Sequence, residues 1–278
     1  MTKVFVTGWP ISHALSPALH GFWMRRHKID GSYEALAVKP KDFPAFLQAL
    51  PGSGFVGGNV TIPHKQAAFA LCPHHDRDAA TIGSVNTLWL ENGELHGGCT
   101  DAYGFAANLD DQVPQWKSSL SALVLGAGGA SRAIVHALKA AGIARISVVN
   151  RTLERAKQLA TAFGKPVSAY GWADLPEALN QADLIINTTS LGMGGLQEIL
   201  IDLSPASPRA IVADIVYSPL ATALLNQAKK RGLVTADGLG MLLHQAVPGF
   251  EKWFGVRPVV DAELRHHMLS VLAARNPD

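Results

Sequence analysis

Short apolar runs alternate with segments of helical periodicity from the beginning of the chain, a pattern typical of α/β proteins. The runs KVFVTG and SYEALAV predict strands, and SPALHGFWMRRHKI and residues 40–50 predict helices. NVTI predicts a short strand that ends at Pro63, with a helix from His64. Two alternating runs joined at Asn92-Gly93 predict a hairpin, and residues 101–109 predict a helix.

A second strand–helix series begins near residue 121. SALVLGAGGASRAIVHALKAAG predicts a strand, a glycine turn and a helix, and ARISVVN, ADLIINTTS and AIVADIVY predict further strands. TLERAKQLATAF and PLATALLNQAKKRG predict helices, the latter closed by Gly232, and the chain is again helical from Gly238 onward. The stretch DQVPQWKSSLS, residues 111–121, predicts a surface connection between the two series.

Composition and charge narrow the classes of partner. The chain has 278 residues, with 24 Lys plus Arg against 22 Asp plus Glu and a formal net charge of +2, so neither nucleic acid nor a membrane surface is expected as partner. No run of about 18 apolar residues predicts a spanning helix. The start, MTKVFVTGWP, predicts a first strand and not a signal peptide.

The two cysteines, Cys72 and Cys99, match neither a metal-ligand spacing nor a disulfide framework, which favours a reduced, cytoplasmic setting. Among eleven histidines, His74-His75 precede Asp76 and follow Pro73. We interpret this segment as a solvated turn and not as a metal cluster, because adjacent residues in a turn rarely converge on one ion. No metal site is predicted.

A glycine turn marks a candidate nucleotide site. It follows an apolar strand and opens a helix, and its residues are Gly126, Ala127, Gly128, Gly129 and Ala130. The first glycine permits the tight turn, and the second lets the backbone approach a pyrophosphate at the helix N-terminus. Ser131 stands where the full dinucleotide pattern has its last glycine. The strand–turn–helix–strand context strengthens an otherwise weak motif.

The end of the next strand bears on which nucleotide binds. NAD sites usually carry an acidic residue there that accepts from the ribose 2′-hydroxyl, and this chain has Asn150, Arg151 and Thr152 instead, with Arg155 one turn later. Guanidinium groups suit a 2′-phosphate, so we expect NADP. The alternative is that both arginines are ordinary solvated residues at a helix start.

Polar residues in the first hundred positions suggest a site for a polyhydroxylated ligand. Thr61 and Lys65 follow a strand, Asn86 is expected inside a strand, and Asp101 and Ser16 stand at helix starts. Each has an ordinary interpretation alone: Ser16 and Asp101 as helix caps, and Lys65 as a solvated lysine. Only their combination favours a binding site.

With these motifs in view, the chain resembles the shikimate dehydrogenases over residues 8–255. The resemblance rests on nine ordered blocks, GWPISHALSPALH, GNVTIPHK, IGSVNT, GCTDAYGF, LGAGGASRA, VNRTLERA, INTTSLGM, VYSPL and DGLGMLLHQA. It implies reversible reduction of 3-dehydroshikimate to shikimate by NADPH, a step of the chorismate route to aromatic amino acids. It also implies a cytoplasmic protein that acts on a small molecule as a monomer or homodimer.

The resemblance further implies an architecture. A substrate domain would comprise residues 1–102, completed by residues 238–278, and a Rossmann-type, doubly wound NADP domain would comprise residues 103–237, with the active site in the cleft. The C-terminal helices of the chain, within residues 238–278, would return to the substrate domain.

Family roles carry over to matching positions. Lys65 and Asp101 resemble the catalytic pair, in which the lysine stabilises the developing alkoxide and exchanges a proton with the reacting oxygen. The implied substrate contacts are Ser16, Thr61, Lys65, Asn86, Asp101 and Gln245, with Tyr217 near them. The implied cofactor contacts are the glycine turn, Asn150, Arg151, Thr152, Arg155, Thr188, Gly238 and Met241.

The chain departs from the family pattern at two positions. Ala14 replaces a serine that binds the substrate carboxylate, and Cys99 replaces an asparagine just before Thr100 and Asp101. Ser12 would point the same way as position 14 if this segment were extended, and would then supply the missing hydroxyl. The departures leave open a related ring acid, such as quinate or an aminated shikimate, as substrate. A non-catalytic NADP-sensing protein is the alternative from another functional class.

Overall fold

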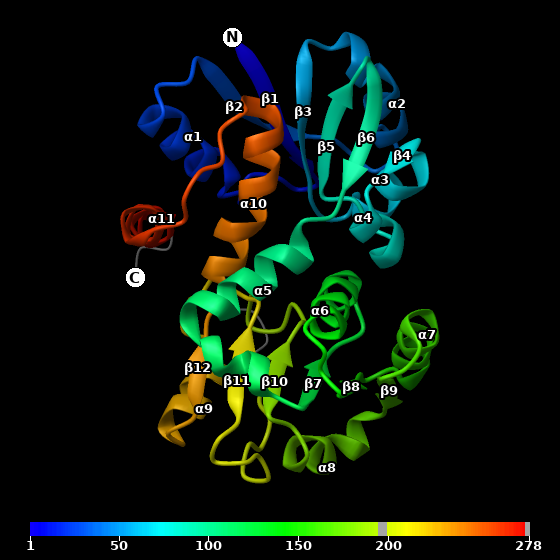
Figure 1. Cartoon of the computed structure of the whole chain (residues 1–278), viewed down its shortest axis with the longest axis vertical. Coiled ribbons are helices and arrows are strands. Elements are labelled where there is room, and N and C mark those ends of the chain that lie inside the picture. Colours follow the sequence, from blue (N-terminus) through cyan, green and yellow to red (C-terminus); the bar gives the residue numbers. More distant parts are fainter. Residues whose placement is uncertain (194–198, 276–278) are drawn as a thin grey trace. The chain divides into compact units, whose positions relative to one another are not determined.

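The computed structural model describes residues 1–193 and 199–275 (Figure 1). By internal contacts the chain divides into two compact units, one formed by Met1–Thr100 with Leu243–Asp278 and the other by Asp101–Leu242. Each unit is built on a six-stranded sheet. The predicted α/β class with a Rossmann-type domain is therefore confirmed.

The first unit has a mixed sheet with strand order β2-β1-β3-β5-β6-β4. Strands β2 and β3 run parallel to β1, whereas β5 is antiparallel to both β3 and β6. The strands are β1 Thr2–Gly8, β2 Gly31–Ala37, β3 Phe55–Val60, β4 His74–His75, β5 Thr87–Glu91 and β6 Glu94–Gly98.

Helices surround this sheet, and large apolar side chains fill its core. Phe5, Trp23 and Phe250 are fully buried, and the Trp23 and Phe250 rings meet edge to face at 5.3 Å. The helical segments are α1 Ser16–Arg26, α2 Phe43–Ala49, the 3₁₀ turn η1 Leu50–Gly52, α3 Lys65–Leu71, α4 Arg77–Ile82, α10 Leu239–Phe254, which begins in the second unit, and α11 Ala262–Arg275.

The second unit has a fully parallel sheet with strand order β12-β11-β10-β7-β8-β9. The chain moves outward from β7 through β8 and β9, and then returns to place β10 on the other side of β7. This reversal creates a switch point between β7 and β10, where ligands of doubly wound sheets bind at the carboxyl ends of the strands. The strands are β7 Ser121–Leu125, β8 Arg145–Val149, β9 Val167–Tyr170, β10 Leu184–Asn187, β11 Ile211–Asp214 and β12 Val234–Ala236.

The central strands of the second unit are shielded from solvent, since all five residues of β7 and all four of β10 are buried. Such continuous apolar runs are typical of parallel sheets covered on both faces. The covering segments are α5 Asp101–Gln112, the 3₁₀ turn η2 Pro114–Ser118, α6 Gly129–Ala140, α7 Leu153–Phe163, the 3₁₀ turn η3 Trp172–Asp174, α8 Leu175–Asn180 and α9 Ala223–Lys230.

The predicted hairpin is confirmed, with Asn92 and Gly93 at φ of 54° and 83° joining β5 to β6. The predicted surface connection at residues 111–121 is mostly exposed, but it is not irregular throughout, since it includes the end of α5 and the turn η2, and part of it is buried. Trp116 is fully buried within η2, and its indole Nε1 donates to Asp110 Oδ1 at 2.8 Å. The polar residues beside Trp116 in the sequence show no apolar periodicity, but the large apolar area of the indole ring stabilises its buried position.

Two further predictions need correction. The helix expected over residues 219–232 begins only at Ala223, because Thr222 is its N-cap and accepts from Leu225 N. His74 is not in a turn, since His74–His75 form the edge strand β4, which pairs with β6. Strand β9 and strand β12 were not predicted, because runs of three or four residues are too short to establish a period.

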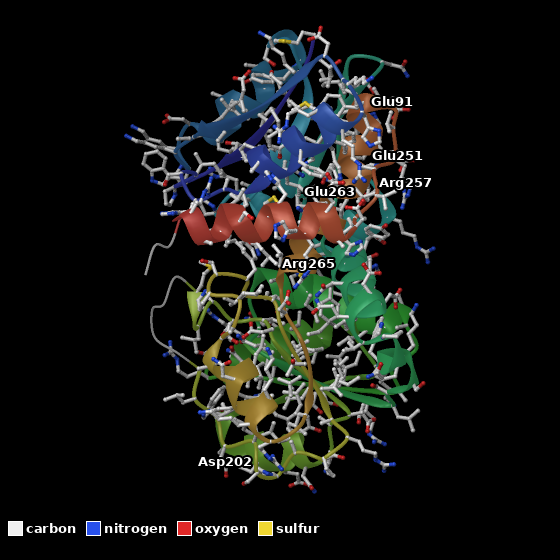
Figure 2. All side chains as sticks on the ribbon, turned by 90° about the vertical axis from the view of Figure 1, so that its left-hand side faces the viewer. Glu91, Asp202, Glu251, Arg257, Glu263 and Arg265 are labelled. Carbon is white, nitrogen blue, oxygen red and sulfur yellow. The ribbon has the colours of Figure 1, made fainter. Side chains whose placement is uncertain are left out.

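Charged side chains of the first unit lie at its surface, where Glu251 and Arg257 form an ion pair at 2.6 Å (Figure 2). Within the part of the chain that the structure describes, none of the helices has the length and apolar character needed to cross a membrane.

Candidate active site

The glycine turn joins β7 to α6 at the switch point of the second sheet. Gly126 has a φ of +103°, which side chains rarely adopt, and a Cβ there would lie 2.8 Å from Thr189 Cγ2. In contrast, a Cβ at Gly128 or Gly129 would meet no atom within 4 Å. Gly126 is thus required by the turn itself, whereas the open space beside Gly128 and Gly129 permits a ligand to approach the backbone.

The N-terminus of α6 is suited to bind an anion. Gly128 is its N-cap and provides no side chain to satisfy the first N–H groups, and the first turn has no acidic residue. Ser131, which replaces the last glycine of the motif, is fully buried, and its hydroxyl donates to Gly128 O at 2.6 Å. The serine therefore fits this turn without projecting into the open space.

Asn150 connects the glycine turn to the end of β8. Its Oδ1 accepts from Ala127 N at 3.2 Å, and its Nδ2 donates to Thr152 O at 2.8 Å. Arg151, Thr152 and Arg155 are exposed, and Arg155 N donates to Thr152 O in the first turn of α7. Two guanidinium groups and an amide therefore lie where an NAD site would have a carboxylate.

A buried polar network, which the sequence analysis missed, stands at the neighbouring strand ends. Asn187 at the end of β10 donates to Asp214 Oδ1 at 2.9 Å, and Thr222 donates to Asp214 Oδ2 at 2.8 Å. Thr188 donates to Leu125 O at 2.8 Å, which joins the end of β10 to the end of β7. The sequence did carry a signal for this network, because the apolar strands LIIN and IVAD each end in a polar residue, Asn187 and Asp214.

Burial raises the pKa of Asp214 to about 6, against the effect of its hydrogen bonds from Val216 N, Thr222 and Asn187. The carboxylate is 2% exposed and holds the backbone where β11 ends. Tyr217, a predicted substrate contact, follows three residues later and is half-buried. The network therefore orders the segment that carries Tyr217.

Gly238 stands close to the same segment. A Cβ at this position would lie 2.4 Å from Ile215 O and 2.7 Å from Val216 O, so only glycine fits. Met241 follows in the first turn of α10 and is half-buried. The predicted cofactor residues of the second unit thus come from the ends of β7, β8 and β10 and from the start of α10.

Asn86 is the centre of the polar cluster in the first unit. Its Nδ2 donates to Thr100 Oγ1 at 3.0 Å and to Gln245 Oε1 at 3.2 Å, and its Oδ1 accepts from Thr100 N at 2.9 Å. Thr100 Oγ1 also donates to Gln245 O at 2.7 Å. The structure therefore brings together Asn86 and Gln245, which lie 159 positions apart in the sequence.

Asn86 does not lie inside a strand as predicted, because β5 begins at Thr87. Its backbone continues the sheet pairing all the same, since Val60 N donates to Asn86 O at 2.8 Å. The side chain of Asn59 also donates to Asn86 O, at 3.1 Å. Asn86 N also donates to Gly98 O at 3.0 Å, so the backbone groups of Asn86 remain paired just outside the strand.

Thr61 and Lys65 lie at the carboxyl end of β3. Thr61 N donates to Thr7 O at 2.9 Å, and its Cγ2 lies against Gly8, where a Cβ would come within 2.6 Å. Lys65 is the first residue of α3 and is half-buried, and its carbonyl accepts from Val85 N at 3.0 Å. The lysine backbone is therefore tied to the segment that leads to Asn86.

Ser16 is not the N-cap of its helix. The cap residue of α1 is Leu15, which makes no side-chain cap hydrogen bond, and Ser16 is the first helical residue and is 8% exposed. Its hydroxyl instead interacts with the buried Tyr33, whose own hydroxyl donates to Asn59 Oδ1 at 2.6 Å. This placement removes the simple capping interpretation of Ser16.

The idea that Ser12 compensates for Ala14 is wrong in its premise. Ala14 N donates to Ile11 O at 3.0 Å, so residues 11–14 form a turn and not an extended segment. Ser12 is exposed, whereas Ala14 is half-buried. Alternate residues of a turn do not share a direction, so the serine side chain is not equivalent to one at position 14.

Asp101 is the first residue of α5 and is 8% exposed, and the preceding Cys99 is 2% exposed. Between them, Thr100 is held by Asn86 and Gln245. Lys65 belongs to the first unit, and Asp101 opens the second.

Comparisons with known proteins agree with this geometry. Three family models match, described as shikimate dehydrogenase substrate binding domain over residues 6–88, shikimate/quinate 5-dehydrogenase over residues 109–215, and shikimate 5′-dehydrogenase C-terminal domain over residues 238–262. The shikimate dehydrogenase (NADP(+)) of Brucella canis is 59% identical over 274 residues, covering 98% of this chain and 95% of that protein.

Two solved structures extend the similarity to the fold. Shikimate 5-dehydrogenase from Thermus thermophilus, in complex with NADP(H) and shikimate, has a TM-score of 0.86 and 34% identity over 99% of both chains. Quinate dehydrogenase from Corynebacterium glutamicum, in complex with NAD, has a TM-score of 0.89 and 28% identity, covering 97% of this chain and 99% of that one. With full-length identity of this extent, three matched domains and a glycine turn at the switch point, the chain belongs to the shikimate dehydrogenase family.

Proposed function

We propose that this protein is an NADP-dependent shikimate dehydrogenase, which reversibly reduces 3-dehydroshikimate to shikimate. The observation that carries the proposal is the 59% identity with a shikimate dehydrogenase (NADP(+)) across nearly the whole chain. At that similarity, substrate and cofactor class are expected to be shared. The same reaction belongs to the chorismate route to aromatic amino acids.

The cofactor is NADP. The open backbone at Gly128 and Gly129 and the uncapped N-terminus of α6 suit the pyrophosphate, and Arg151 and Arg155 suit the 2′-phosphate. Gly238 and Met241 would border the nicotinamide, with Thr188 at the adjoining strand end. When bound, NADPH supplies the hydride.

The substrate contacts in the first unit are Ser16, Thr61, Lys65, Asn86 and Gln245. This assignment is supported by the cluster in which the side-chain amides of Asn86 and Gln245 hydrogen-bond to each other. A polyhydroxylated ring needs several donors and acceptors held in fixed directions, and amides linked in this way lose little freedom when the ligand binds. Asp101 and Tyr217 complete the proposed set.

Lys65 and Asp101 are the proposed catalytic pair. Reduction of a ketone creates a developing alkoxide, and the Lys65 ammonium both stabilises that charge and donates the proton. In the oxidation direction Lys65 accepts the same proton. Asp101 is its proposed partner because the family resemblance implies that the two residues act as a pair.

The proposal extends to the organisation of the chain. The proposed substrate domain is residues 1–102 with 238–278, and the proposed NADP domain is residues 103–237. The compact units of the structure, Met1–Thr100 with Leu243–Asp278 and Asp101–Leu242, differ from these bounds by a few residues. A cytoplasmic location fits two cysteines that make no disulfide, Cys72 and Cys99. The protein would act as a monomer or homodimer.

A related ring acid, such as quinate or an aminated shikimate, is the second candidate substrate, because Ala14 and Cys99 both depart from the family pattern at the proposed substrate site. The test is to measure NADP reduction with purified protein and shikimate or quinate side by side, and to repeat it with NAD. A kcat/KM that is highest for shikimate with NADP supports the proposal. A higher value for quinate would replace the substrate, and no activity with either would favour an NADP-sensing protein.

A further inference from the structure

The edge of the first sheet carries a cluster of side chains that the proposed dehydrogenase reaction does not use. Strand β4 pairs in parallel with β6, and the register places His74 opposite His96. Glu94 is two residues before His96 on β6, so both side chains lie on the same face of the sheet. The register therefore gathers two imidazoles and a carboxylate on neighbouring strands.

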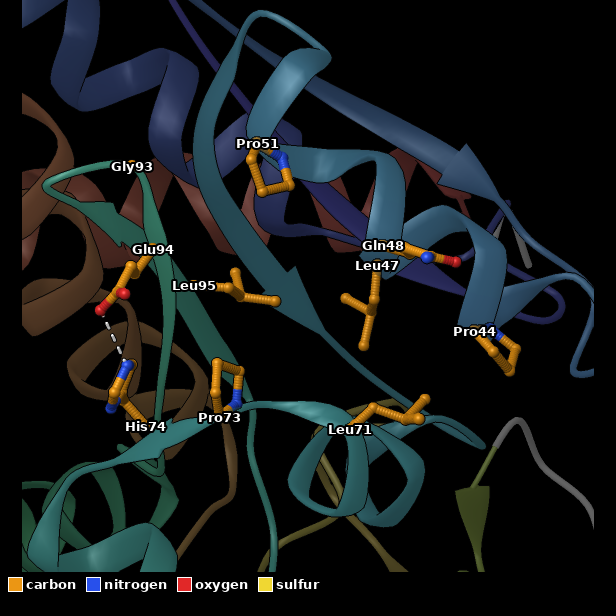
Figure 3. Close-up of a pocket in the computed structure, with 10 residues that line it drawn as sticks. All are labelled: Pro44, Leu47, Gln48, Pro51, Leu71, Pro73, His74, Gly93, Glu94 and Leu95. Carbon is orange, nitrogen blue, oxygen red and sulfur yellow. Dashed lines mark hydrogen bonds and ion pairs between the residues drawn. The ribbon is translucent and has the colours of Figure 1, made fainter.

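The three side chains are close enough to share one ligand. His74 Nε2 lies 3.0 Å from Glu94 Oε2 (Figure 3), and the imidazole rings of His74 and His96 stack with centroids 4.5 Å apart. One nitrogen or oxygen atom from each residue lies within 4.8 Å of the other two. All three are accessible to solvent, with His74 and Glu94 exposed and His96 half-buried.

We propose that His74, His96 and Glu94 bind a divalent transition-metal ion of the zinc type. Imidazole nitrogen and carboxylate oxygen are ligands that zinc accepts, and three protein ligands with a solvent molecule complete its tetrahedral shell. Bond lengths of about 2.0–2.2 Å place such ligand atoms roughly 3.4 Å apart, so the three side chains, whose ligand atoms now lie within 4.8 Å of one another, would rotate to meet on one ion. The carboxylate of Glu91, 3.9 Å from His96 Nε2, adds negative charge beside the site.

The neighbouring His75 shows that this arrangement is specific to one face of β4. The His75 side chain points away from the cluster, its Nε2 lies 2.7 Å from Phe69 O, and its ring packs on Phe69 with centroids 4.3 Å apart. Adjacent histidines in the sequence are thus separated by the strand. Pairing between strands, and not proximity in the sequence, creates the proposed site.

The expected consequence is a tie between β4 and the rest of the sheet. Strand β4 has only two residues, so its backbone pairing with β6 is short. A metal ion held by His74 on β4 and by Glu94 and His96 on β6 would bind the folded state alone and would raise its stability by mass action. The site is a structural one, and no step of the dehydrogenase reaction depends on it.

The test uses the full chain without a histidine tag. Isothermal titration with ZnCl₂, and absorption spectroscopy with CoCl₂, are carried out on the wild type and on the variants His74→Asn, His96→Asn and Glu94→Gln. We expect one Zn²⁺ per chain with micromolar affinity, a tetrahedral Co²⁺ spectrum, and a thermal midpoint that rises by a few degrees with Zn²⁺. Each histidine variant should lose at least about tenfold in affinity, and Glu94→Gln should also weaken binding.

His75→Asn is the matched control and should bind as the wild type does. Glu94→Gln, at an exposed position, keeps the test valid if a histidine variant fails to fold. Three results would overturn the proposal: no saturable binding by the wild type, equal binding by the wild type and all three ligand variants, or a Co²⁺ spectrum with thiolate charge-transfer bands that Cys72→Ser abolishes.

Discussion

The imidazole ring of His20 stacks on the phenol ring of Tyr33, with centroids 4.1 Å apart and ring planes 6° apart. His20 is fully buried, and among the described residues neither of its ring nitrogens has a hydrogen-bond partner. Burial lowers the pKa of His20 to about 3, so the ring stays neutral in the folded protein. The core of the first unit thus contains a neutral imidazole whose two nitrogens make no hydrogen bond to the described residues.

We expect His20→Phe to reduce the loss of stability in mild acid. In the wild type, the unfolded chain binds a proton at His20 below its ordinary pKa of 6.5, and the folded chain does not until about pH 3. Stability is therefore lost as the pH falls below 6.5. Between pH 7.5 and 5 the His20 contribution to the free energy of unfolding should fall by about 2 kcal/mol.

Urea unfolding at the two pH values measures this difference within each protein, so any packing effect of phenylalanine cancels. His27→Phe, at an exposed position, is the control for replacing a histidine with phenylalanine. If His20→Phe retains the full wild-type loss between pH 7.5 and 5, then His20 is not held neutral.

Unlike His20, Asp214 should contribute more to the free energy of unfolding as the pH falls. Its pKa is raised to about 6 in the folded state, so between pH 6 and 4 the folded chain binds a proton that the unfolded chain does not. Its contribution to stability therefore rises as the pH falls, by about 1.4 kcal/mol between pH 7 and 5. Asp214→Asn removes this gain, and its free energy of unfolding should fall more on acidification than that of the wild type.

The control for this measurement is Asp202→Asn. Asp202 is exposed, and hydrogen bonds from Ser204 lower its pKa, so it does not titrate between pH 5 and 7 in either state. Identical pH profiles for Asp214→Asn and the wild type would show that the Asp214 carboxyl is not protonated in this window.

Much of the fold could be predicted from periodicity and turn residues. The Asn92-Gly93 hairpin and the Gly126 turn are local features, because a positive φ at a glycine or asparagine is required whatever the rest of the chain does. The burial of Trp116 inside a mostly exposed connection could not be predicted, because it depends on the elements that cover the ring, and no residue near it in the sequence shows them.

In the candidate site, too, local features could be predicted from the sequence, whereas contacts between distant residues could not. Residues at strand ends and helix starts, such as Lys65 and Arg151, could be named from local patterns and family motifs. The hydrogen bond from Asn86 to Gln245 and the network around Asp214 could not, because they depend on which strand ends are neighbours. The register that pairs His74 with His96 is equally non-local, and the sequence therefore suggested only a solvated turn.

Cofactor choice is tested by Arg151→Ala. If the guanidinium binds the 2′-phosphate, KM for NADP should rise by the loss of a charged hydrogen bond, about 1.5–3 kcal/mol or roughly ten- to a hundred-fold. KM for NAD should change much less, because NAD has no phosphate there. Arg145→Ala is the matched control, as Arg145 is an exposed arginine at the opposite end of β8. Equal effects of Arg151→Ala on both nucleotides would contradict the assignment.

Substrate recognition is tested by Ala14→Ser. The added hydroxyl should lower KM for shikimate if the substrate carboxylate lies near this half-buried position, because a hydrogen bond to an anion contributes about 1.5–3 kcal/mol. Ser12→Ala should have no effect, since Ser12 is exposed in a turn. An unchanged KM for shikimate together with a lowered KM for quinate would point to quinate as the natural substrate.

The catalytic pair is tested by Lys65→Met. A solvated lysine at a helix start is dispensable, whereas a group that acts on the developing alkoxide contributes to the transition state more than to ground-state binding. We therefore expect kcat to fall by about 10²–10⁴-fold with little change in KM, and NADP binding, measured by titration, to stay normal. Gln66→Met, at the next and exposed residue of α3, should retain wild-type kcat.

The double variant distinguishes a catalytic pair from two separate contributions. Asp101→Asn alone should also lower kcat, and if the two groups act as a unit, Lys65→Met with Asp101→Asn should be little slower than the slower single variant. Two independent contributions would instead multiply. A Lys65→Met enzyme with kcat close to that of the wild type would exclude the mechanism and leave Asp101 as the first residue of a helix with no catalytic role.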